Sequence, residues 1–146
     1  MIKLQQTVLM VSIALVAACA GPITTTDYVC EGANPGIVPI NIIYNGSQIT
    51  VAPDPQTADE GDVLRFNLVG PNNVRVSTSG KTPNDGWLNG SGKKKAGKAA
   101  SNQFYVCVPT DLFDDEEEGV TEKDYEYNVN AVGKPQLDPK VRIIRK

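Results

Sequence analysis

Three cysteines, at positions 19, 30 and 107, are the side chains of this sequence best suited to chemistry, and the chain has no histidine. A thiol can be acylated, oxidised to a disulfide or used as a soft metal ligand. Both methionines, Met1 and Met10, lie in the first 18 residues. Imidazole bases and the usual soft-metal partners of a thiolate are therefore missing from the rest of the chain. This inventory predicts a protein without catalysis, metal or other cofactor.

The first cysteine follows an apolar N-terminal segment. Lys3 is the only charged residue before Cys19, and apolar residues dominate from Val8 to Val16. The layout is typical of a secretory signal peptide. Its apolar core is about half the roughly 20 residues that a membrane-spanning helix needs. The sequence therefore predicts export and not a permanent transmembrane helix.

The residues Val16-Ala17-Ala18-Cys19 resemble the lipobox of bacterial lipoproteins. The resemblance implies cleavage before Cys19, a diacylglycerol on its thiol and an acyl chain such as palmitate on the new amine. Several acyl chains together anchor a protein stably. Ala20, where an aspartate would mark retention in the inner membrane, favours the outer membrane, facing the periplasm. The alternative is an ordinary signal peptide that is cleaved nearby, with Cys19 as a free thiol.

Three segments are predicted from this layout: a signal peptide at 1–18, a lipidated N-terminus and polar tether at 19–36, and a single domain at 37–146. Without Lys3, 13 basic residues face 17 acidic ones, a net charge of −4. A nucleic-acid-binding domain is normally basic, so no nucleic-acid partner is expected.

Alternating apolar residues in the domain predict β-strands. Leu64, Phe66 and Leu68 are the clearest such set, and Asn45-Gly46 between two β-rich runs predicts a hairpin with a type I′ turn. The other strands are expected near 74–78, 104–108, 125–131 and 141–144, with a long loop over 81–101. About seven strands separated by turns predict an all-β fold, an antiparallel β-sandwich.

The order of several features resembles a cupredoxin-like sandwich. These features are Glu60-Gly61-Asp62, the run from Phe104 to Pro109, and the ending Tyr127 to Ala131 with Leu137-Asp138-Pro139. An immunoglobulin-like Greek key would produce many of the same features, so both topologies stay open. The cupredoxin resemblance implies that Cys107 lies where a copper thiolate could lie. A blue-copper site also needs two imidazoles and usually a thioether, so the chain departs from the family at its metal site.

Cys30 and Cys107 are the two cysteines that remain if Cys19 carries lipid. An exported, oxidising location favours a disulfide between them, and two free thiols are the alternative. Cys107 alternates with Phe104, Val106 and Val108, so its side chain is expected to face away from the core.

Three features could contact a partner. Trp87 could be an exposed anchor or a plug of the core. The basic run could contact anionic groups or be a solubilising loop, and the acidic run could bind a partner or Ca²⁺ or be a solvated loop. The runs comprise Lys93, Lys94 and Lys95, and Asp114, Asp115, Glu116, Glu117 and Glu118.

These observations predict a lipid-anchored lipoprotein of the bacterial envelope that acts as a non-catalytic binding or structural module. Its partners would be the membrane, through Cys19, and an unidentified envelope protein or glycan. An alternative comes from Asp27-Tyr28-Val29-Cys30-Glu31-Gly32, which resembles the start of membrane-bound inhibitors of c-type lysozyme, small lipoproteins with a Tyr-x-Cys opening and a late cysteine partner. That resemblance implies an inhibitor of lysozyme-like enzymes in the periplasm.

Overall fold

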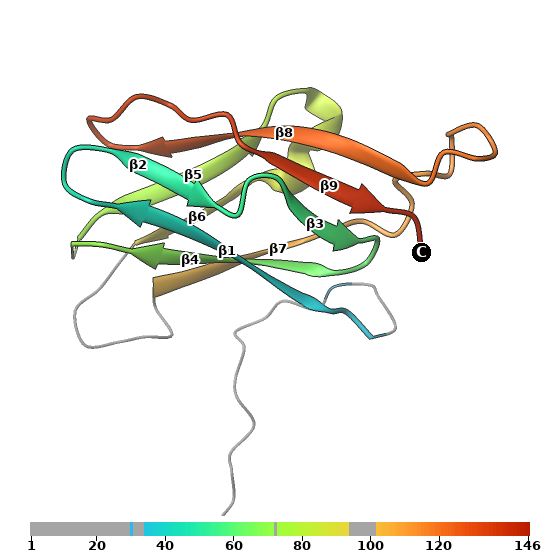
Figure 1. Ribbon diagram of the computed structural model, residues 1–146, viewed down its shortest axis with the longest axis horizontal. Helices are drawn as coiled ribbons and strands as arrows, with labels where there is room; N and C mark the ends of the chain where they lie inside the picture. The colour runs from blue at the N-terminus through green and yellow to red at the C-terminus, as the bar shows by residue number, and fades with distance from the viewer. Residues whose placement is uncertain (1–29, 31–33, 72, 94–101) are drawn as a thin grey trace, which may run out of the picture.

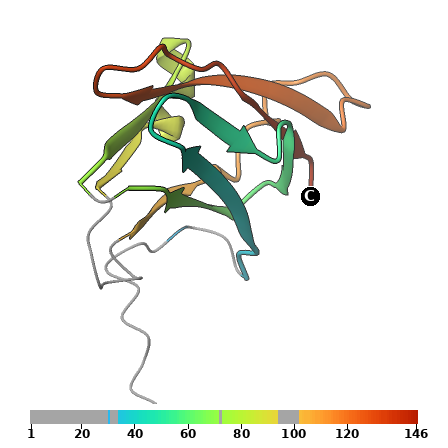
Figure 2. The same ribbon diagram turned by 60° about the vertical axis from the view of Figure 1, so that its left-hand side comes forward.

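Alternating apolar residues form two β-sheets that pack face to face in the computed structural model (Figures 1 and 2). The structure describes residue 30 and residues 34–71, 73–93 and 102–146. The predicted all-β sandwich is confirmed. Its core lies between the sheets, where Phe66 stacks on Phe104 with ring centroids 4.8 Å apart and meets the edge of Tyr127.

One sheet has four strands in the order β2-β1-β4-β7, and the other has five in the order β3-β9-β8-β5-β6. The strands of the first sheet are β1 (Ile37–Tyr44), β2 (Ile49–Ala52), β4 (Val63–Val69) and β7 (Gln103–Cys107). Those of the second are β3 (Gln56–Asp59), β5 (Arg75–Gly80), β6 (Gly90–Lys93), β8 (Glu122–Ala131) and β9 (Lys140–Ile144). A short 3₁₀ helix, η1 (Pro83–Leu88), joins β5 to β6.

Two strand pairs are parallel, β1 with β4 and β3 with β9, where the sequence predicted antiparallel pairs only. An apolar alternation of period two defines which face is buried, but it is the same for either strand direction. The chain also changes sheets between β2 and β3, over residues 53–55. As a result β4 returns to the first sheet beside β1, in the same direction.

Two of the described strands, β3 and β6, were not predicted. Only Ala58 of β3 is buried, so the strand has no apolar alternation. In β6, Gly90 and Gly92 face the ring of Phe104, and a Cβ on either would lie 2.8 Å from that ring. The close approach requires glycine, and because glycine is typical of loops, the sequence did not predict this strand. The predicted loop over 81–101 therefore contains a helix and a strand.

The predicted hairpin is confirmed, but its turn differs. Tyr44 pairs with Ile49, so four residues connect β1 to β2 in place of a two-residue type I′ turn. Within this turn Gly46 has a positive φ of 94°. The Asn45 side chain accepts hydrogen bonds from the backbone N–H groups of Ser47, at 3.2 Å, and Gln48, at 2.9 Å. This side-chain capping stabilises the longer turn.

Tyr127 carries a buried hydroxyl with no hydrogen-bond partner among the described residues. Burial raises the pKa of Tyr127, and the Asp54 carboxylate adds to the effect. An unpaired buried hydroxyl opposes folding, so Tyr127→Phe should increase the free energy of unfolding by about 1 kcal/mol at pH 7. Above about pH 10 the unfolded tyrosine ionises and the folded one does not, so wild-type stability falls by up to about 1.4 kcal/mol per pH unit.

Urea denaturation at pH 7 and in this alkaline range tests the Tyr127 prediction. The advantage of Tyr127→Phe should grow as the pH rises, since phenylalanine cannot ionise. Tyr44→Phe is the control, because it removes an exposed hydroxyl that donates to the Gly46 carbonyl. A Tyr127→Phe variant less stable than wild type at pH 7 would contradict an unpaired hydroxyl.

Candidate functional site

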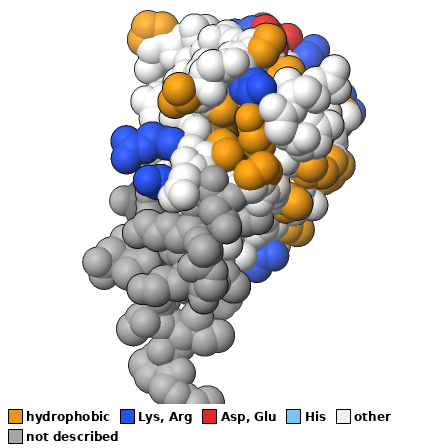
Figure 3. Space-filling view, turned by 90° about the vertical axis from the view of Figure 1, so that its left-hand side faces the viewer, with side chains coloured by type: hydrophobic (Ala, Val, Ile, Leu, Met, Phe, Trp, Pro, Cys, Tyr) orange, Lys and Arg blue, Asp and Glu red, His pale blue; other side chains and the backbone are white. Residues whose placement is uncertain are grey.

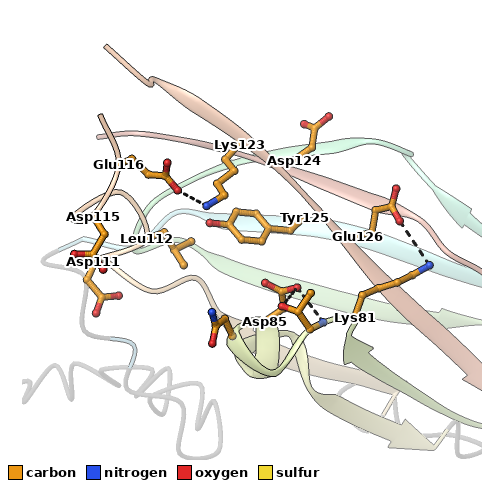
Figure 4. Close-up of a pocket in the computed structure, with 12 residues that line it drawn as sticks. Lys81, Asp85, Asp111, Leu112, Asp115, Glu116, Lys123, Asp124, Tyr125 and Glu126 are labelled. Carbon is orange, nitrogen blue, oxygen red and sulfur yellow. Dashed lines mark hydrogen bonds and ion pairs between the residues drawn. The ribbon is translucent and has the colours of Figure 1, made fainter. Parts of the chain in front are cut away.

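A cleft of about 890 Å³ opens between η1, the loop from β7 to β8, and the first half of β8 (Figure 4). Its charged lining is mainly acidic. The carboxylates are Asp85, Asp111, Asp115, Glu116, Asp124 and Glu126, and the cations are Lys81 and Lys123. Six carboxylates against two lysines give the cleft an excess of negative charge, which favours a cationic ligand.

The cleft forms because β8 is longer than the strand beside it. β5 ends at Gly80, which pairs with Tyr127, whereas residues 122–126 of β8 continue beyond this point. Those residues pair with β9 on one side only in the described part of the chain. The other edge of β8 is left open, and the cleft lies beside it.

Several of the acidic side chains already have partners. Glu116 accepts a hydrogen bond from Lys123, which raises the pKa of that lysine. Asp124 accepts one from Arg142 at 2.7 Å, which lowers the pKa of the carboxyl. In contrast, Asp111 and Asp115 form no ion pair with any described residue. Their charges are available to a ligand.

Tyr125 lies in the wall of the cleft and is only 7% exposed. Its ring meets the edge of Trp87 with centroids 5.4 Å apart, and the Lys123 Nζ lies 5.6 Å from the ring centre. Figure 4 shows its hydroxyl pointing along the cleft toward Leu112. Burial raises the pKa of Tyr125, so the hydroxyl stays protonated. Among the described residues that hydroxyl forms no hydrogen bond.

The predicted pair of Cys30 and Cys107 lies at disulfide-bonding distance, with Cα atoms 5.5 Å apart. Phe104, Val106 and Val108 are buried, whereas Cys107 is half-buried and faces outward, as predicted. The bond connects the N-terminal segment to the end of β7. A disulfide-bonded Cys107 offers no thiolate to copper.

Trp87 is half-buried and packs against the core, nearer to the plug than to the exposed anchor. The deeper anchor of this segment is Leu88, which is fully buried and was not singled out from the sequence. The carbonyl of Leu88 accepts a hydrogen bond from the buried Thr78 hydroxyl at 2.8 Å. These contacts attach η1 to the sandwich and position one wall of the cleft.

The two charged runs have different outcomes. In the acidic run, Asp115 and Glu116 line the cleft, while Asp114, Glu117 and Glu118 do not. In the basic run, Lys93 is exposed at the end of β6, outside the cleft lining. Lys94 and Lys95 lie outside the described residues, as do the signal peptide, Cys19 and most of the tether.

Most of the cleft residues were not predicted from the sequence, including Lys81, Asp85, Asp111 and those of β8. The first half of β8 contains consecutive charged or polar residues, a pattern that many solvent-exposed strands share. These residues are Lys123, Asp124, Tyr125 and Glu126. What distinguishes these residues is their place in the structure. They lie in the first half of β8, a strand of ten residues, beyond the end of its shorter neighbour β5, which has six.

The two ends of the sandwich differ in character. β8 begins at the cleft, and beyond its other end Val132 is 88% exposed. Val69, which ends β4, is 45% exposed. Figure 3 shows hydrophobic side chains gathered on this second end. The acidic cleft thus lies at one end of the sandwich and the gathered hydrophobic side chains lie at the other.

No family model matches the sequence, and a search of curated proteins finds no significant relative. In the described part of the chain, no cluster of three or more acidic, histidine or cysteine side chains has the geometry of a metal site. The same residues include no helix of the length and hydropathy required to cross a membrane.

Proposed function

We propose that this protein is a lipoprotein of the bacterial envelope whose sandwich is a non-catalytic binding module. The observation that carries the proposal is the acidic cleft beside β8, where the carboxylates of Asp111 and Asp115 have no ion pair and the hydroxyl of the buried residue Tyr125 has no hydrogen bond among the described residues. In this proposal, lipid on Cys19 attaches the module to the outer membrane, facing the periplasm. The partner is a cationic component of the envelope.

The strand arrangement supports a cupredoxin-like over an immunoglobulin-like sandwich. Immunoglobulin domains are built from two antiparallel sheets. Here each sheet contains a parallel pair, and β2 and β3 place consecutive segments of chain in different sheets. We therefore propose a cupredoxin-like domain that has exchanged metal chemistry for binding.

Two observations support a binding role without catalysis. The chain has no histidine, which is the most common general base near neutral pH. The buried carboxylate of Asp62 has a structural role, since it accepts hydrogen bonds from the backbone N–H groups of Gly36, at 2.9 Å, and Asp59, at 3.0 Å. It thus joins the start of β1 to the turn before β4.

Crosslinking in intact cells tests the binding function. Full-length protein should yield a crosslinked envelope partner, and Asp111→Asn with Asp115→Asn should reduce its yield at least about tenfold, because two uncompensated charges are removed from the cleft. The matched control is Glu117→Gln with Glu118→Gln, which removes the same charge outside the cleft lining and should leave the yield unchanged. Equal loss in both variants would show that net charge and not the cleft recruits the partner.

Inhibition of lysozyme-like enzymes is the second candidate. It is favoured by the joining of Cys30, from the Tyr28-Val29-Cys30 segment, to a cysteine late in the chain. Purified protein added to a lysozyme assay distinguishes the two functions. Stoichiometric inhibition would support the inhibitor, and unchanged lysozyme activity would leave the general binding module.

A further inference from the structure

The open edge of β8 presents backbone groups as well as side chains to the cleft. The Tyr127 N–H donates to the Pro139 carbonyl across the pair with β9, at 3.1 Å. In an antiparallel pair, alternate residues direct both backbone groups to the same neighbour. The odd-numbered residues therefore face β9, and the N–H and C=O of Glu122 and Asp124 face the opposite edge. There they have no backbone partner among the described residues.

The polar side chains around this edge suit a ligand that carries positive charge and can form hydrogen bonds. The Tyr125 hydroxyl, on a residue more than nine-tenths buried, can donate or accept one hydrogen bond. Asp111 and Asp115 lie across the cleft from η1, on the loop that faces it (Figure 4). A cation that approaches them adds charge-assisted hydrogen bonds, which are stronger than neutral ones.

We infer that the cleft binds an extended protein segment containing lysine or arginine, which adds to β8 as a strand in the place that β5 leaves after Gly80. This inference rests on the proposed binding function and names the class of its partner. The backbone of the segment pairs with the open edge at Glu122 and Asp124. Its basic side chains reach Asp111 and Asp115.

Strand addition fits this cleft better than binding of a metal or a lone cation. An isolated ion would use the carboxylates and leave the backbone edge of β8 unpaired, and the described carboxylates do not converge as metal ligands do. A strand satisfies both the edge and the charges, and main-chain hydrogen bonds supply affinity while side-chain contacts supply specificity. The acidic side chains also discourage pairing between two copies of this edge, because like charges repel.

Binding of synthetic peptides to the full-length protein in detergent tests the inference. The probe is an acetylated peptide that alternates lysine with threonine. One control is the same peptide with a methyl group on every backbone nitrogen, which keeps the charge but removes the backbone donors from both edges of the strand. A second control alternates glutamate with threonine. We expect the lysine–threonine peptide to bind at least about tenfold more tightly than either control, since each tenfold step needs only one or two hydrogen bonds.

Variants and hydrogen exchange then locate the peptide. Asp111→Asn with Asp115→Asn should weaken binding about tenfold or more, and Tyr125→Phe about threefold, whereas Glu117→Gln with Glu118→Gln should have no effect. The amide protons of Glu122 and Asp124 should exchange more slowly when the peptide is bound. The Tyr125→Phe variant removes only a side-chain hydroxyl that makes no hydrogen bond in the described fold and keeps the ring and the backbone pairing with β9, so it should remain folded.

Equal affinity for the N-methylated and the unmodified lysine–threonine peptides would overturn strand addition, as would unchanged exchange at Glu122 and Asp124. Failure of every peptide to bind would overturn the inference too. The proposed function would nevertheless survive if the cleft variant Asp111→Asn with Asp115→Asn still loses its crosslinked partner in cells. If that variant keeps its partner, the proposed function itself fails.

Discussion

Replacing Cys107 by serine is expected to lower the free energy of unfolding by about 4 kcal/mol, a large part of the stability of a domain of this size. The bond closes a loop with a sequence separation of 77 residues. Without it the unfolded chain gains the conformational freedom that the cross-link had removed. Urea denaturation of oxidised wild type and of the variant, compared by their midpoints, measures the difference.

Two controls separate the cross-link from the side chain. Cys30→Ser should destabilise as much as Cys107→Ser, and the double variant should cost no more than either single one, because all three lack the same bond. Reduced wild type should behave similarly. Intact mass should show that Cys30 and Cys107 take up alkyl groups only after reduction. Alkylation of both residues in denatured, unreduced protein would contradict the disulfide.

Replacing Cys19 by serine is expected to abolish attachment to the membrane through lipid. Serine lacks the thiol that the lipobox resemblance requires, so no diacylglycerol is added and the mature acylated form is lost. Each buried methylene contributes about 0.8 kcal/mol, so a cleaved protein without acyl chains is released from the membrane, and a protein that is not released is the unprocessed precursor. Labelling with radioactive palmitate and fractionation of cells measure the change.

The matched control for this variant is Cys30→Ser, which also removes one cysteine but leaves the lipobox intact. It should incorporate palmitate and sediment with membranes like wild type. A Cys19→Ser protein of mature mass that still sediments with membranes would refute the lipid anchor. The result is independent of the cleft, since the two features are tested by different substitutions.

The core strands could be predicted from the sequence because burial of one strand face requires an apolar residue at every second position. In β4, Leu64, Phe66 and Leu68 alternate with less buried residues, and the structure buries all three. This apolar alternation is absent from β6, where the inward positions are glycines because the ring of Phe104 leaves no room for a side chain. The alternation is the same for either strand direction, so the parallel pairing of β1 with β4 could be seen only in the structure.

The cleft was less predictable than the fold. The acidic run drew attention to Asp115 and Glu116, which do line the cleft, but composition alone could not separate them from their neighbours Glu117 and Glu118. The alternation of β8 predicted that Tyr125 is an ordinary core residue of the strand. It lines the cleft because β5 stops at Gly80, and the lengths of two strands distant in sequence decide this.

The disulfide also has a mechanical consequence for a domain held at its N-terminal side. A pulling force applied before Cys30 passes through the covalent bond into Cys107 of β7 before it can load β1. The hydrogen bonds of β1 to β2 and β4 are thereby shielded from being peeled open one after another. If the protein is tethered to one layer of the envelope and grips a partner in another, the sandwich can bear tension along that connection without unravelling from its first strand.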